Sequence, residues 1–206
     1  QGTLIRDAQR NRTRTRKTHD RPNSEQSDRL HRRRGALPPA QRTASMTVLT
    51  PMSAETYSHY MDAAVAGYAA DNVASGRWPA EGATARSQAD FIDSLPQGLA
   101  TPDNFLFEIK AGADGPTVGY LWFAIVEKNG IRSAFVYDVE VLAPFRRQGH
   151  ARAAFEALEP IVRGLGLDRI GLHVFAHNPG AQALYSRLGY AVTSVNMQKQ
   201  LGSPDT

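Results

Sequence analysis

Six consecutive residues in the second half of the chain combine positive charge with small side chains. They are Arg146, Arg147, Gln148, Gly149, His150 and Ala151. The flanking pattern predicts that they join the end of a strand to the start of a helix, where unpaired N–H groups and the helix dipole attract anions. Gly149 would let a phosphate approach the backbone closely. The segment therefore predicts a pyrophosphate site, and an ordinary charged helix cap is the alternative.

Two carboxylates, Asp138 and Glu140, lie within an otherwise apolar predicted strand. Because side chains alternate along a strand, both should share one face, opposite Tyr137, Val139 and Val141. Burying an acid without a partner is costly, so one of them is a candidate base with a pKa raised by desolvation. We favour Glu140, which is nearer to the basic turn. The alternatives are two solvent-facing acids, or acids that dock a cationic substrate without proton transfer.

A third group of polar residues follows later in the chain. Asn178 and Tyr185 are seven residues apart, nearly two helical turns, so they should face the same way. A tyrosine hydroxyl, with an unperturbed pKa of about 10, could protonate a leaving group held beside it. The alternative for Tyr185 is a core tyrosine. His173 and His177 lie where a strand runs into a loop, without a carboxylate at ligand spacing, so we predict no metal site.

The chain divides near Met46. Residues 1–45 carry 12 basic and four acidic side chains and no aromatic residue, so they cannot bury enough apolar surface to fold. We expect a disordered, Arg-rich tail upstream of a natural start at Met46, with phosphate binding or a transit peptide as alternatives. Residues 46–206 carry 12 basic and 16 acidic side chains and suit one domain. Without an apolar run long enough to span a bilayer, we expect a cytoplasmic protein.

Hydrophobic periodicity and turn signals predict the elements of this domain. The predicted helices are 54–75, 83–95, 149–165 and 179–188. The predicted strands are 47–51, 105–111, 117–127, 133–142, 169–175 and a last strand or hairpin over Tyr190–Leu201. Asn129-Gly130 is a hairpin signal, and the third helix must cross over to a parallel strand. The fold class is α/β, with a mixed, mostly antiparallel sheet of six to seven strands and about four helices.

The basic turn and the Asn178 segment together resemble the motifs of the GNAT superfamily of acetyl-CoA-dependent N-acyltransferases. That family carries (Gln/Arg)-x-x-Gly-x-(Gly/Ala) after its fourth strand, matched here by Arg146, Gly149 and Ala151. It later carries Asn-x-x-Ala-x-x-x-Tyr and then Gly-(Phe/Tyr), matched by Asn178, Ala181, Tyr185, Gly189 and Tyr190. The two motifs stand in the right order and on the right predicted elements.

The resemblance implies acetyl-CoA as cosubstrate. The amides of the Gln148–Ala151 turn would hold its pyrophosphate. Pantetheine would pair with the backbone near Val139–Val141, where the fourth and fifth strands splay apart, and an N–H there would polarise the thioester carbonyl. Asn178 would bond to the pantetheine or phosphate region, and Tyr185 would protonate the thiolate. Because the chain has no cysteine, a cysteinyl acyl-enzyme is excluded, and direct attack by an amine in a ternary complex is expected.

The acyl acceptor is less well defined by the sequence. An acidic domain favours a cationic primary amine, such as a small amine, an amino sugar, a polyamine, or a protein N-terminus or lysine. No membrane partner is expected, and a homodimer is left open. The rival functions are a non-catalytic acyl-CoA-binding or regulatory module and, less favoured, nucleic-acid binding through the basic tail.

Overall fold

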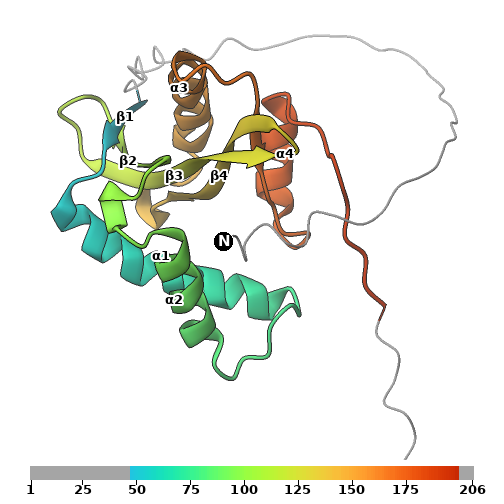
Figure 1. Ribbon diagram of the computed structural model, residues 1–206. Helices are drawn as coiled ribbons and strands as arrows, with labels where there is room; N and C mark the ends of the chain where they lie inside the picture. The colour runs from blue at the N-terminus through green and yellow to red at the C-terminus, as the bar shows by residue number, and fades with distance from the viewer. Residues whose placement is uncertain (1–46, 200–206) are drawn as a thin grey trace, which may run out of the picture.

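A computed structural model describes residues 47–199 of the 206-residue chain (Figure 1). The tail predicted for residues 1–45 and the start at Met46 lie outside the described residues. The helices are α1 (Ala54–Ala74), α2 (Ala83–Ser94), α3 (His150–Gly164) and α4 (Pro179–Arg187), with 3-10 helices η2 (Gly98–Ala100) and η3 (Ala143–Phe145). The strands are β1 (Thr47–Pro51), β2 (Asn104–Ala111), β3 (Thr117–Lys128), β4 (Ile131–Val141) and β5 (Ile170–Leu172). In this part of the chain, no helix is both long and apolar enough to cross a membrane.

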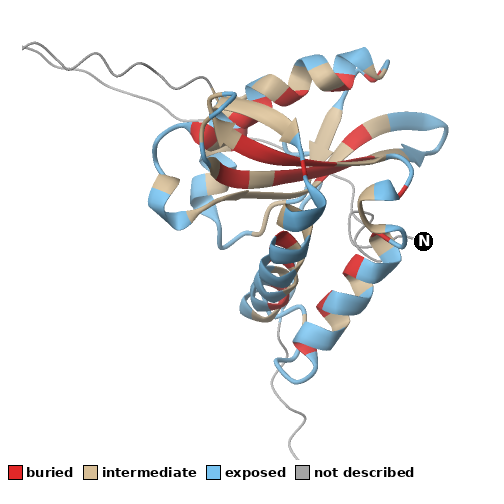
Figure 2. Cartoon of the chain, turned by 90° about the vertical axis from the view of Figure 1, so that its left-hand side faces the viewer, coloured by how far each residue is buried: buried red, intermediate tan, exposed pale blue. Residues whose placement is uncertain are grey.

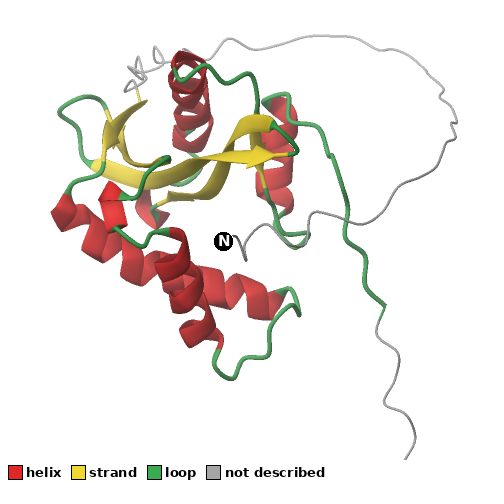
Figure 3. Cartoon of the chain, in the orientation of Figure 1, coloured by secondary structure: helices red, strands yellow, loops and turns green. Residues whose placement is uncertain are grey.

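The strands form one mixed sheet (Figure 3), and their order in it is β1-β2-β3-β4-β5. Neighbours pair antiparallel except β4 and β5, which are parallel and joined through α3. At the predicted β3–β4 turn, Asn129 and Gly130 have φ values of 53° and 74°, the left-handed backbone that a two-residue hairpin requires. The four predicted helices and the mixed, mostly antiparallel sheet are confirmed.

The prediction of six to seven strands is wrong for residues 47–199, which form five. The segment predicted as a last strand or hairpin, Tyr190–Leu201, is irregular through Lys199, and its end lies outside the described residues. Its apolar side chains at Val192, Val195 and Met197 are exposed. A strand needs a neighbour for its N–H and C=O groups, and the last strand of the sheet, β5, has only three residues to offer.

Helices cover both faces of the sheet, and buried positions concentrate on the central strands (Figure 2). α1 and α2 pack on one face, over a buried cluster that includes Tyr60 and Trp122 (Figure 1). α3 and α4 pack on the other face, over a cluster that includes Phe123, Phe155 and Leu158 and that we call the α3 cluster. Because β4 lies between these two layers, its side chains can reach either one.

Local signals set the starts of the helices that position the site. Ser53 Oγ accepts the Thr56 N–H at 3.1 Å at the start of α1. Asn178 Oδ1 accepts the Ala181 N–H at 3.1 Å at the start of α4. By contrast, α3 begins after Gly149, which has no side chain to cap it. The first N–H groups of α3 are therefore left for another acceptor.

Candidate active site

A β-bulge at Tyr137 shapes the end of β4. Trp122 of β3 pairs with Asp138, and the next β3 residue pairs with Val136, so Tyr137 is the extra residue. Tyr137 stacks on Trp122 on the α1 side of the sheet, with ring centroids 4.7 Å apart, whereas Val139 packs into the α3 cluster. The prediction that Tyr137 shares a face with Val139 is therefore wrong, because the bulge interrupts the alternation along the strand.

β4 and β5 part from each other beside this bulge. Their parallel pairing ends at Val136 and Leu172, whereas β4 continues to Val141. β5 is shorter than the predicted strand over 169–175 because the bulged part of β4 no longer lies in register with it. The predicted splaying of these two strands is thus present, and within residues 47–199 it leaves one edge of β4 without a strand neighbour over residues 137–141.

The backbone groups of Val139 and Val141 point into this gap. The Leu142 N–H donates to the Val118 carbonyl of β3 at 2.9 Å. Because the direction of the backbone amides alternates along a strand, those of Val139 and Val141 point away from β3. An extended ligand in the gap could therefore pair with the backbone of β4 much as a further strand would, except at the Val141 carbonyl, which accepts a hydrogen bond from Arg146.

The basic turn between β4 and α3 has left-handed backbone at two positions. The φ angles are 63° at Arg147 and 93° at Gly149. Apart from its own chain neighbours, no atom of the described residues lies within 4 Å of where a Cβ on Gly149 would stand, so the described chain leaves the space beside this residue open. The turn presents the positive end of α3 to this space, which suits an anion.

The Arg146 side chain connects the turn to the end of β4. Its Nε donates to the Val141 carbonyl at 2.9 Å, and one terminal nitrogen lies 3.8 Å from Glu140 Oε1. The guanidinium is therefore directed back toward the strand, although it remains largely exposed. The charge that Arg146 adds lies between the predicted pyrophosphate site and the acids of β4.

Two other side chains of the turn stabilise its shape. Gln148 Nε2 donates to the Pro144 carbonyl at 3.1 Å. The His150 ring is buried and shares a hydrogen bond of 3.0 Å with Thr47 Oγ1 of β1. A ligand in front of the turn would thus meet the backbone N–H of His150, and not its ring.

Asp138 is held by α1. Its Oδ2 accepts a hydrogen bond from the Tyr60 hydroxyl at 3.0 Å. The surrounding groups remove hydration from the carboxylate, and this desolvation raises its pKa from 3.8 to about 6. The bond from Tyr60 lowers the pKa, and the neighbouring charge of Glu140 raises it. A carboxyl group with this pKa is ionised at neutral pH and still basic enough to accept a proton.

Glu140 lies on the same face as Asp138, as predicted, but in a different environment. It pairs in register with Tyr120, its side chain is 36% exposed, and its Oε1 lies 3.8 Å from a terminal nitrogen of Arg146. The Glu140 carboxylate therefore keeps contact with water and with a positive charge. Of the two acids, only Asp138 has the desolvated surroundings that we expected of a base.

Tyr185 of α4 is 8% exposed and packs edge-on against Phe155 of α3, with ring centroids 5.3 Å apart. Burial raises the pKa of its hydroxyl to about 12, and the charge of Asp138 contributes to the rise. The hydroxyl is therefore protonated at neutral pH and can donate. Both readings of Tyr185, a core tyrosine and a proton donor, are compatible with this position.

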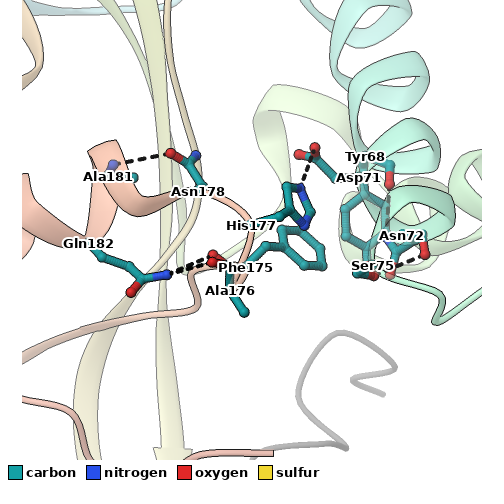
Figure 4. A network of polar contacts seen from close by, with 10 residues as sticks. All are labelled: Tyr68, Asp71, Asn72, Ser75, Phe175, Ala176, His177, Asn178, Ala181 and Gln182. Atoms are coloured by element: carbon teal, nitrogen blue, oxygen red, sulfur yellow. Dashed lines mark hydrogen bonds and ion pairs between the residues drawn. The ribbon is translucent and has the colours of Figure 1, made fainter. Parts of the chain in front are cut away.

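The loop between β5 and α4 is tied to α1 (Figure 4). His177 Nε2 lies 3.5 Å from Asp71 Oδ1 of α1, and the His177 ring stacks on Phe175. From α4, Gln182 Nε2 donates to the Phe175 carbonyl of the loop at 3.1 Å. Asn178 uses its Oδ1 to cap α4, so its amide nitrogen is the group that could donate to a ligand. Across residues 47–199, no cluster of His and acidic side chains could hold a metal ion.

Sequence reasoning missed the two α1 residues that reach this site. In the sequence, Tyr60 is recognisable only as a member of the apolar face of a predicted helix. No pattern in the sequence marks Asp71 as a functional residue. Asp71 is close enough to raise the pKa of Asp138. The packing of α1 across the end of β4 brings these groups together, and no spacing within the sequence encodes that contact.

Comparison with known proteins agrees with this geometry. The model of the acetyltransferase (GNAT) family matches residues 65–190. The N-acetyltransferase YycN of Bacillus subtilis is 38% identical over 157 residues, which cover 76% of this chain and 100% of YycN. The N-acetyltransferase YdgE of the same organism is 32% identical, over 74% of this chain and 97% of YdgE. The crystal structure of YycN superposes with a TM-score of 0.72 at 36% identity, covering 76% of this chain and 99% of that chain.

These matches confirm the resemblance drawn from the two motifs, and they cover the elements that build the site. The family match includes α3, β5 and α4, and it also includes the bulged end of β4. The chain belongs to the GNAT acetyltransferase family, and the protein is an acyltransferase.

Proposed function

We propose that the protein transfers the acetyl group of acetyl-CoA to a primary amine, which attacks directly in a ternary complex. The observation that carries the proposal is the end of β4, where an open backbone edge, a positive helix end and a desolvated carboxyl group lie together. A module that only binds an acyl-CoA would need the first two features and would have no use for the third.

The residues present fit acetyl-CoA. The pyrophosphate would bind the backbone N–H groups of residues 148–151, because the space in front of Gly149 is open and Arg147 adds charge. The extended pantetheine arm would pair with the backbone of Val139 and Val141, with Asn178 donating from the opposite side. When bound, acetyl-CoA supplies an activated thioester, and a backbone N–H of this part of β4 would polarise its carbonyl.

The acid and base follow from the two desolvated groups. Asp138 would take the proton from the incoming ammonium group, which makes the amine nucleophilic. The nitrogen would attack the thioester carbon, the carbon–sulfur bond would break, and Tyr185, which is protonated at neutral pH, would donate its proton to the departing sulfur. The second proton that the nitrogen loses on becoming an amide would pass to the Tyr185 phenoxide, so the net proton would remain on Asp138. We assign the base role to Asp138 in preference to Glu140, since Glu140 is exposed and paired with Arg146. Glu140 would then contribute negative charge that attracts a cationic acceptor.

The acceptor side favours a cation. Asp138 and Glu140 share the face of the sheet that α1 covers, and Asp71 of α1 adds a third carboxylate near Asp138. Residues 46–206 together carry four more acidic than basic side chains. A primary amine that arrives as an ammonium ion matches this charge.

A thiol-release assay tests the proposal. The full 206-residue chain is incubated with acetyl-CoA and a panel of small amines, amino sugars, polyamines and peptides, and free CoA is detected with a colorimetric thiol reagent. The chain has no cysteine, so the protein contributes no background. We expect CoA release that depends on one class of amine. Binding of acetyl-CoA without release by any amine would favour the binding module, and absence of binding would contradict the proposed site.

A further inference from the structure

Tyr60 is the one α1 residue whose side chain hydrogen-bonds to Asp138. Its side chain is fully buried, with 0% of its surface exposed, and its hydroxyl lies 3.0 Å from Asp138 Oδ2. The Tyr60 ring packs against the Tyr120 ring of β3, with centroids 5.4 Å apart. The phenol is therefore fixed by packing on α1 and β3 and has little freedom to leave the carboxylate.

The direction of this hydrogen bond is defined by protonation. Burial, together with the charge of Asp138, raises the pKa of Tyr60 well above its usual value, so the phenol keeps its proton. Tyr60 thus donates, and Asp138 Oδ2 accepts. The carboxyl group also takes a hydrogen bond from the backbone of Val139. The Tyr60 hydroxyl is thus its partner from outside β4.

We propose that Tyr60 is a positioning residue that orients the Asp138 carboxylate and sets the pH at which it accepts a proton, an inference that rests on the proposed role of Asp138 as the base. The hydrogen bond stabilises the ionised carboxylate and ties it to α1. Without it, Asp138 would keep the hydrogen bond from the Val139 backbone, would lose its tie to α1 and would ionise at a higher pH.

The charges around Asp138 explain why this one donor matters. Glu140 on β4 and Asp71 on α1 both disfavour its ionisation, and burial acts in the same direction. Tyr185 on α4 is neutral and within electrostatic reach. The Tyr60 hydroxyl is thus the main side-chain group that favours the charged form, against desolvation and two like charges.

The test compares Tyr60→Phe with Tyr57→Phe in the full chain. The first substitution keeps the buried ring and removes only the donor. The second removes a phenol one turn earlier on α1, which is not the partner of Asp138. For Tyr60→Phe we expect the acidic limb of the kcat/KM profile to move up by about one pH unit or more, the size of a hydrogen bond to a charged group. Tyr57→Phe should leave the limb in place.

A second measurement follows Asp138 without relying on catalysis. The ¹³C resonance of its carboxyl group, assigned by its loss in Asp138→Asn, is titrated in the wild type and in both tyrosine variants. The pKa from this titration should rise in Tyr60→Phe alone. A folded Tyr60→Phe protein with unchanged titration and an unchanged acidic limb would overturn the proposal, even if its activity fell. Failure of the proposed function would be visible separately, as a wild type that acetylates no amine while the carboxyl titration still reports on the hydrogen bond.

Discussion

Replacing Asp138 with asparagine removes the proposed base while it keeps the shape of the side chain and an oxygen that can accept the Tyr60 hydrogen bond. The substitution should lower kcat/KM at pH 7 by about 100-fold or more, the usual contribution of a positioned base. The binding of acetyl-CoA should change little, because the proposed CoA contacts come from the backbone of β4 and from the α3 turn.

The pH dependence makes this prediction quantitative. With a pKa of about 6, Asp138 is ionised in about one molecule in ten at pH 5 and in about nine in ten at pH 7. For an amine that arrives as an ammonium ion, kcat/KM of the wild type should therefore rise about tenfold between pH 5 and pH 7 and then level off. In Asp138→Asn, only amine already neutral in solution can react, so the rate should keep rising with pH beyond 7.

The stability of the variant separates loss of chemistry from loss of fold. Because the folded-state pKa of Asp138 lies above its unfolded value, its contribution to stability is fully present below about pH 4 and is lost as the pH rises to about 6. Above that pH the charged carboxylate is a cost to the fold. Asp138→Asn should therefore be at least as stable as the wild type at pH 8, measured by urea unfolding.

Steady-state kinetics from pH 5 to pH 9 with the best acceptor of the panel provide the assay, and Glu140→Gln is the matched comparison. Glu140→Gln should keep the inflection and move it slightly to lower pH, because the Glu140 charge raises the pKa of Asp138. The reasoning is refuted if Asp138→Asn retains both its rate and an inflection near pH 6. If only Glu140→Gln abolishes the inflection, the base is Glu140.

Three other substitutions test the remaining parts of the site and the core. Gly149→Glu should abolish acetyl-CoA binding in calorimetry, because its carboxylate would occupy the anion position. Gly166→Glu is the control, since Gly166 also has a positive φ and open space beside it, and it should leave binding intact. Equal affinities of the two variants would rule out the turn as the pyrophosphate site. Tyr185→Phe should lower kcat by about 100-fold and change CoA affinity little, and an unchanged kcat with chemistry limiting would exclude Tyr185 as the acid. Leu158→Ala should lower the free energy of unfolding by about 2–5 kcal/mol in urea, because Leu158 is fully buried in the α3 cluster. Ile92→Ala, at an exposed position, should change this free energy little. Similar losses of stability in the two variants would contradict the assigned core.

The sequence predicted the parts of the site that depend on local signals. The basic turn, the start of α4 at Pro179 and the Asn129-Gly130 hairpin each follow from residue types at fixed short spacing, and all three are present. The helices were predicted within a few residues for the same reason. The order of the strands followed because short connections and one crossover helix leave few arrangements open.

The rest of the site depends on contacts between distant segments. The bulge at Tyr137 changes which side chains share a face, and alternation within β4 gives no sign of it. The contrast between Asp138 and Glu140 comes from Tyr60, 78 residues earlier in the chain, and from Arg146. From the sequence, we favoured Glu140 as the base because it is nearer to the basic turn. In the structure, desolvation favours Asp138 for this role. Likewise, the alternating residues after Tyr190 predicted a strand for which the described chain offers no partner.

Transfer of a labelled acetyl group tests the central proposal most directly. Acetyl-CoA carrying ¹³C in its acetyl group is incubated with the full chain and the amine panel, and the products are examined by mass spectrometry, with Gly149→Glu in parallel. We predict one class of amine that carries the label with the wild-type protein and none with Gly149→Glu. Labelled acetate without labelled amine, or labelled amine in equal amounts with both proteins, would contradict transfer through this site.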